Sequence, residues 1–102
     1  MQDAAAGRLW VRLMKRHRMI QDVLIPCRRD DPQAALHEAL PKLDLSQPVW
    51  LERHRQDWAQ YAMARFLPEH FMEPVPFDYM EISFISPQET PSQTRRHPLQ
   101  DA

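Results

Sequence analysis

Glycine is almost absent from this chain, since only Gly7 occurs among 102 residues. Loops that cradle phosphate groups need glycine, because the backbone must approach the phosphate closely. One glycine cannot build the dinucleotide-binding fingerprint or the P-loop. Both classes of nucleotide-binding site are therefore excluded.

Cysteine also occurs once, as Cys27, so a disulfide within the chain is impossible and a zinc site made of cysteines is not expected. No segment approaches the ~18 consecutive apolar residues of a membrane span. The first residues, MQDAAAGRLW, lack the basic-then-apolar order of a signal peptide. We therefore expect a cytoplasmic protein with no membrane partner.

The composition that remains is that of one small globular domain. Hydrophobic residues make up 43% and charged residues 26% of the chain, and this length can bury a core without metal or disulfides. The last residues are polar and rich in proline, which is typical of disorder. We predict a flexible leader over 1–7, one domain over 8–86 and a disordered tail over 87–102.

Alternating apolar residues predict the strands. Segments 8–15 and 19–27 are expected to form an antiparallel hairpin with a charged tip, and 77–85 is expected to form a further strand. Segment 46–51, SQPVWL, is a candidate for a short buried strand.

Two segments are expected to be helical. The first begins after Asp31, a good N-cap followed by Pro32 in the first turn, and Pro41 should kink or divide it near 37–40. The second runs over 52–66. A single turn opened by Pro68 follows. These elements predict an α+β fold of order β-β-α-β-α-β, with a three- or four-stranded, largely antiparallel sheet packed on helices.

One face of this sheet is plainly core, and the other carries mixed residues. Arg12 is expected to lie opposite or diagonal to Glu81 as a cross-strand pair. Three covers for this second face remain open: the 52–71 region of the same chain, a protein partner or second copy, and nucleic acid. The candidate interaction surface consists of Arg8, Trp10, Arg12, Met14, Tyr79 and Glu81.

The charge is unevenly spread along the chain, although the net charge is only -1. Basic residues are in excess through residue 29, and acidic residues from 30 to 89. A basic hairpin beside an exposed tryptophan would suit nucleic acid, through phosphate contacts and base stacking. Neutralisation of the basic residues by the acidic half would favour protein contacts instead.

Three groups of residues are candidates for chemical sites. The HEAL segment at 37–40 starts like a zinc-protease motif, but Pro41 stands where the second histidine is needed. The EHFME segment at 69–73 offers metal ligands only if they converge. Cys27 with one of the five histidines could make a nucleophile and base, but the sequence places no oxyanion hole and no orienting third group. We assign no catalytic residue, metal, cofactor or small-molecule substrate, and we predict a protein that is not an enzyme.

Several segments together resemble a family of short, uncharacterised bacterial proteins of about 90–100 residues. They are RLWVRLMK, RDDPQAALHEAL, PVWL and above all RFLPEHF with the following FDYMEISFI strand. The resemblance covers roughly residues 8–85. It implies a compact cytoplasmic domain and carries over no activity. The favoured function is a non-enzymatic protein-interaction module or homo-oligomer, and the alternative is a nucleic-acid-binding protein that uses the basic hairpin.

Overall fold

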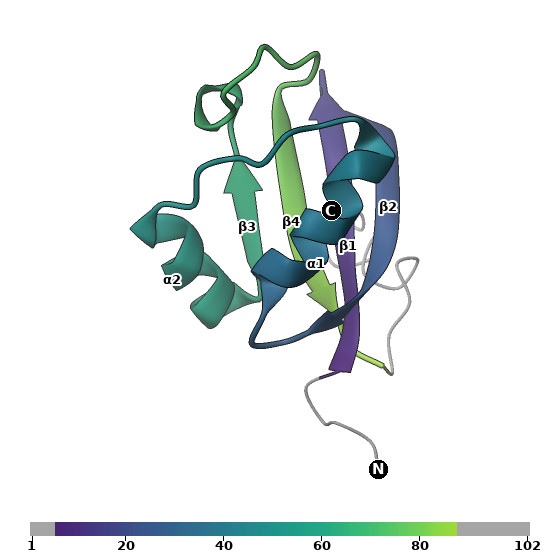
Figure 1. Ribbon diagram of the computed structural model, residues 1–102, viewed down its shortest axis with the longest axis vertical. Helices are drawn as coiled ribbons and strands as arrows, with labels where there is room; N and C mark the ends of the chain where they lie inside the picture. The colour runs from purple at the N-terminus through teal and green to yellow at the C-terminus, as the bar shows by residue number, and fades with distance from the viewer. Residues whose placement is uncertain (1–5, 88–102) are drawn as a thin grey trace, which may run out of the picture.

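A four-stranded antiparallel sheet forms the centre of the protein (Figure 1). The computed structural model describes residues 6–87. The strands are β1 (Ala6–Lys15), β2 (Arg18–Arg28), β3 (Met63–Phe66) and β4 (Tyr79–Ile85), and they lie in the order β2-β1-β4-β3. Strand β1 is therefore central and pairs with β2 on one side and β4 on the other.

The turn between β1 and β2 is tight and contains no glycine. Arg16 and His17 both have positive φ angles, of 53° and 67°, as a two-residue hairpin turn requires. The Arg16 backbone N–H donates a hydrogen bond of 2.8 Å to Asp78 Oδ2. This contact ties the hairpin tip to the segment that leads into β4.

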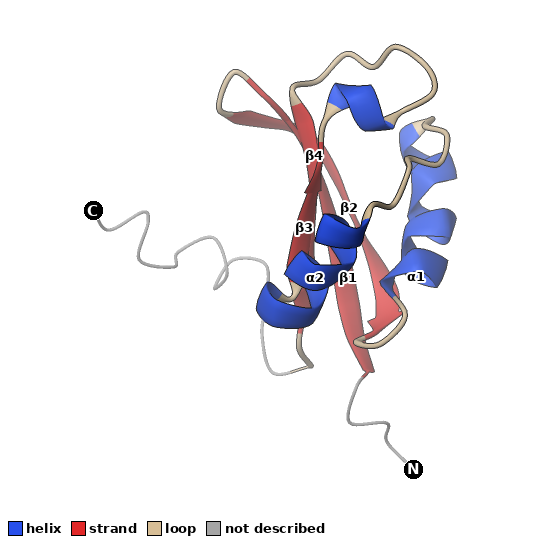
Figure 2. Ribbon diagram, turned by 90° about the vertical axis from the view of Figure 1, so that its left-hand side faces the viewer, coloured by secondary structure: helices blue, strands red, loops and turns tan. Residues whose placement is uncertain are grey.

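Helix α1 (Pro32–Ala39) lies on one side of the sheet (Figure 2), and α2 (Glu52–Tyr61) packs into the same core through Trp58. Short 3-10 turns lie at Leu40–Leu43 and Pro68–His70. Alternate residues of the strands face the helices and form the core with apolar residues of both helices. This core includes Leu9, Val11, Leu13, Ile25, Leu36, Leu40, Trp58, Phe66, Met80 and Ile82.

The predicted α+β class and the antiparallel sheet packed on helices are confirmed. With the two 3-10 turns included among the helical segments, the elements follow the predicted order. Asp31 caps α1 as expected, since its Oδ1 accepts a 3.2 Å hydrogen bond from the Ala34 N–H. In the described part of the chain, no helix is both long and apolar enough to cross a membrane.

The location of the third strand was predicted wrongly. Segment 46–51 is an extended connector whose only ladder contact in the described residues is an isolated bridge between Pro48 and Phe71. The strand instead spans Met63–Phe66, which we expected to be helical. Helix α2 ends at Tyr61, and its C-cap residue Ala62 has a left-handed conformation, with φ at 59°. Pairing with β4 then outweighs the helical tendency of the following residues.

Strand β1 also begins earlier than predicted, at Ala6, so the end of the expected leader belongs to the sheet. Gly7 is required at this position: a Cβ there would come within 2.5 Å of the Ile85 carbonyl oxygen. The rest of the predicted leader and all but the first residue of the predicted tail lie outside the described residues.

Pro41 divides the first helical segment, as the sequence predicted. Helix α1 ends at Ala39, and Pro41 opens the 3-10 turn that follows. We expect Pro41→Ala to lower the free energy of unfolding by about 0.4 to 1 kcal/mol, because the unfolded chain gains conformational freedom. Urea unfolding measures this loss, with the exposed Lys42→Ala as the control. A gain in stability would show that the proline strains the turn.

Candidate functional site

No helix of the described residues covers the second face of the sheet, which we call the open face (Figure 2). Its residues follow from the strand register, because register partners project from the same side of the sheet. Asp22 and Leu24 come from β2, and Met63 and Arg65 from β3. The two central strands contribute Arg8, Trp10, Arg12, Met14, Tyr79, Glu81, Ser83 and the buried Ile85.

One row of the open face crosses all four strands with alternating charge. Asp22 pairs in register with Arg12, Arg12 with Glu81, and Glu81 with Arg65. In spatial order the row is therefore acidic, basic, acidic, basic. We call these four residues the charge ladder.

Glu81 is the centre of the charge ladder. Its Oε2 lies 3.1 Å from Arg12 Nη2, and its Oε1 lies 3.4 Å from Arg65 Nη2. The carboxylate is buried, with 7% of the residue exposed. Two guanidinium groups thus compensate a desolvated negative charge, which would otherwise be costly to bury.

Aromatic rings flank the two arginines. The guanidinium carbon of Arg12 lies 4.4 Å from the centre of the Trp10 ring, and that of Arg65 lies 4.2 Å from the Tyr79 ring. Both are cation–π distances. Trp10 Nε1 donates a 2.9 Å hydrogen bond to Asp22 Oδ2, so the ladder and the rings form one network.

The six predicted surface residues do share one face, and the Arg12–Glu81 pair is present as predicted. Trp10 is only 1% exposed, so it is not a free ring on the surface. Helix α2 does not cover it, because Trp58 of that helix lies in the core on the opposite face. The 52–71 region contributes instead through β3, whose Arg65 contacts Glu81 and Tyr79.

Asp22, Leu24, Met63 and Arg65 were not predicted as members of this surface, whereas Ser83 was placed on this face by alternation. The alternation of buried Ala64 and Phe66 with Met63 and Arg65 is the signal that could have identified β3. Two buried polar atoms of the open face, Arg12 Nε and Ser83 Oγ, have no hydrogen-bond partner among the described residues.

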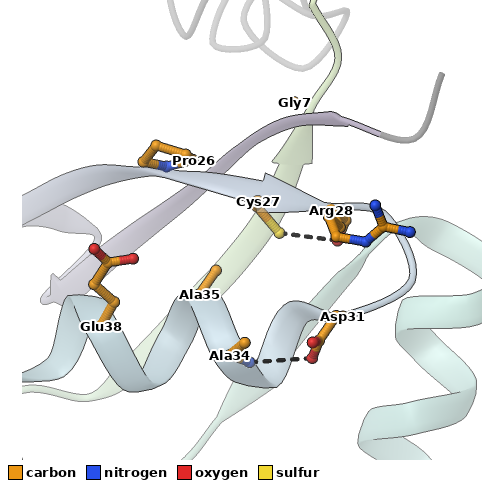
Figure 3. A pocket seen from close by; sticks show the side chains of 8 residues that line it. All are labelled: Gly7, Pro26, Cys27, Arg28, Asp31, Ala34, Ala35 and Glu38. Carbon is orange, nitrogen blue, oxygen red and sulfur yellow. Dashed lines mark hydrogen bonds between the residues drawn. The ribbon is translucent and has the colours of Figure 1, made fainter. Parts of the chain in front are cut away.

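The environment of Cys27 does not support nucleophilic chemistry. Its thiol lies between β2 and α1 beside a pocket of ≈ 300 Å³ and donates a 3.2 Å hydrogen bond to the Arg28 carbonyl oxygen (Figure 3). Burial, and then the negative charge of Asp31, raise the pKa of Cys27 to about 11. The thiol therefore stays protonated at neutral pH, whereas a nucleophile needs the thiolate.

The candidate metal ligands do not converge. His70 is buried, whereas Glu69 and Glu73 are exposed. Among residues 6–87, no group of three or more His, Cys, Asp and Glu side chains is placed to hold a metal ion. Nδ1 of His70 instead accepts a 2.9 Å hydrogen bond from the Leu67 N–H.

A buried histidine pair lies on the helical side. His54 is 1% exposed, stacks on Phe66 at 4.2 Å and meets His70 edge-on at 4.7 Å. Its Nδ1 accepts a 2.8 Å hydrogen bond from the Leu51 N–H, which places the proton of the neutral ring on Nε2. Burial, the neighbouring His70 and then Arg53 lower the pKa of His54, while the backbone of Arg65 and then Asp57 oppose them.

This lowered pKa predicts a loss of stability in mild acid. The unfolded chain takes up a proton on His54 below its ordinary pKa of 6.5, whereas the folded chain resists it. The contribution is therefore complete above pH 6.5 and declines as the pH falls through that value. Protonation would also remove the Nδ1 acceptor that caps α2.

The measurement is the thermal midpoint at pH 7.5 and pH 5.5. We expect His54→Gln, which keeps an acceptor for the Leu51 N–H, to reduce the drop between these two pH values. The exposed His37→Gln is the control and should leave the drop unchanged. An equal drop in all three proteins would contradict the prediction.

Comparisons with protein-family models, curated proteins and solved structures give no match to this chain. The resemblance to a family of short bacterial proteins therefore stays a prediction.

Proposed function

We propose that this protein is a non-enzymatic protein-interaction module whose binding surface is the open face. The observation that carries the proposal is that both helices pack into the core on one side of the sheet, while the other side holds the charge ladder. A sheet face with organised arginines and aromatic rings meets the usual requirements of a protein interface.

The state of the arginines favours a protein partner. Arg12 and Arg65 already share Glu81, so their charges are compensated within the chain. A partner that covers them does not have to neutralise two bare cations. Exposed apolar area is also present at the rim of the face, where Leu24 is 36% exposed.

Nucleic acid fits this surface less well. Stacking of bases needs an accessible ring, and Trp10 is buried under Arg12 and held by Asp22. The guanidinium of Arg12 faces Glu81 rather than a place where phosphate could bind. Arg16 and Arg18 at the hairpin tip are exposed but lie beyond the ladder.

The test is capture of partners on the tagged protein, with and without nuclease, using two matched variants. Leu24→Asp introduces a charge at the rim of the open face, and Val49→Asp does the same at an exposed apolar residue outside the sheet. We expect a set of bound proteins that resists nuclease, is lost with Leu24→Asp and is kept with Val49→Asp. Loss on nuclease treatment would favour nucleic acid and overturn the proposal, as would equal binding by both variants.

A further inference from the structure

We infer that the open face binds a second copy of this chain, face to face, about a two-fold axis that runs parallel to the strands. This inference rests on the proposed function of the open face as an interaction surface. It adds the identity of the partner and the geometry of the contact.

The charge ladder is complementary to itself under that axis. A two-fold axis in the plane between the sheets and parallel to the strands reverses the strand order, so β2 lies over the partner's β3 and β1 over the partner's β4. Asp22 then faces the partner's Arg65, and Arg12 faces the partner's Glu81. Every acidic residue of the ladder meets a basic residue.

The charges also select this axis over the other in-plane choice. A two-fold axis perpendicular to the strands, passing along the ladder, would place each ladder residue against its own copy. Asp22 would then face the partner's Asp22, and Arg12 the partner's Arg12. Juxtaposed like charges are costly at an interface, so that arrangement is disfavoured.

The rows beside the ladder are compatible with the same axis. On one side, Leu24, Trp10, Ser83 and Met63 are register partners. The axis places Leu24 over the partner's Met63, so apolar side chains meet. On the other side, Met14 pairs in register with Tyr79, and the axis places each of them over the other in the partner.

The size of the face suits a weak dimer. With neighbouring strands about 4.8 Å apart and about 3.4 Å per residue, four strands of these lengths outline about 500 Å² on each copy. Trp10, Glu81 and Ser83 are at most 8% exposed, so a partner buries less than this outline, and the total falls below the roughly 1,000 Å² of a stable specific interface. We therefore expect a weak dimer that forms as the protein concentration approaches the millimolar range.

A charge swap tests the geometry directly. Asp22→Arg alone places two pairs of arginines face to face in its own dimer, and Arg65→Glu alone places two pairs of acids. In a mixture, a copy of each restores opposite charges at both positions. Sedimentation velocity from 10 µM to 1 mM is expected to show about tenfold weaker dimerisation for each variant alone and recovery in the equimolar mixture.

A second pair of variants avoids the contacts that Asp22 and Arg65 make within their own chain. In a dimer of one variant, Leu24→Lys or Met63→Glu places each new charge opposite an apolar side chain of the partner. A mixed dimer instead forms one new ion pair and keeps one apolar contact. We expect the mixture to dimerise more tightly than either variant. Thermal melts of each variant confirm that it is folded before its mass is interpreted.

Two results would overturn the inference. One is a wild-type protein that stays monomeric up to 1 mM. The capture of partners described under the proposed function does not depend on this result, so the proposed function would still have its own test. The other is a dimer that neither pair of mixtures rescues, since the copies would then meet through another surface, such as the outer edge of β2.

Discussion

Trp10→Ala is expected to lower the free energy of unfolding by about 3 to 5 kcal/mol, as truncation of a large buried aromatic does. Trp10 is 1% exposed within a single chain, its ring lies under the Arg12 guanidinium, and its Nε1 donates to Asp22. The loss should therefore be present at low protein concentration, where no dimer forms.

Two further variants separate the contribution of the Trp10 ring from that of its hydrogen bond and provide a control. Trp10→Phe keeps an aromatic ring but loses the hydrogen bond to Asp22, and we expect it to cost about 1 to 3 kcal/mol less than the alanine variant. Tyr61→Ala is the control, since Tyr61 is 62% exposed and its truncation should change stability by no more than about 0.5 kcal/mol. Urea unfolding at micromolar concentration measures all three. A loss below about 1 kcal/mol for Trp10→Ala would contradict this expectation and would mean that water reaches the Trp10 ring in the folded protein.

The parts of the fold that the sequence predicted correctly are those with a local cause. Alternation along β1 and β4 identified both strands and their two faces, and Asp31 with Pro32 identified the start of α1. Pro41 ended that helix for a reason that needs no tertiary contact: it lacks a backbone donor.

The error over Met63–Phe66 has a non-local cause. The segment follows ten helical residues without a glycine or proline to stop them, so the local pattern continues the helix. What ends the helix is the pairing of Ala64 with Ile82 and of Phe66 with Met80, which are distant in sequence. Segment 46–51 is the reverse case, because it has a strand-like composition but pairs only through the isolated bridge between Pro48 and Phe71.

The open face was predicted only in part, again because some of its contacts join residues that are distant in sequence. The residues of β1 and β4 could be assigned to one face by alternation alone. The charge ladder could not be seen, because it depends on the register of β2 and β3 against these strands, which a single sequence does not fix. Arg65 illustrates the point, since it joins the site only through its pairing with Glu81.

Glu81→Leu is expected to destabilise the protein by about 3 kcal/mol, because it leaves the guanidinium of Arg12 without its counter-charge. The Arg12 side chain is only 18% exposed, so it cannot return to water without disturbing the Trp10 ring beside it. Arg65 is different: its side chain is 55% exposed and can be hydrated in place. The loss should therefore lie near the lower end for a broken buried ion pair.

The double variant Arg12→Met/Glu81→Leu separates the contribution of the charge ladder to folding from its contribution to dimerisation. Apolar side chains of similar size often replace a buried ion pair without loss, so we expect the double variant to be more stable than Glu81→Leu alone. Arg65→Ala is the matched control, and its loss should stay below about 1 kcal/mol, as for other exposed pairs. Urea unfolding at low concentration gives the three values, and a double variant as unstable as Glu81→Leu would contradict the expected coupling. If the double variant regains stability but no longer dimerises, the pair is kept for recognition, because an apolar pair would serve the fold of the single chain equally well.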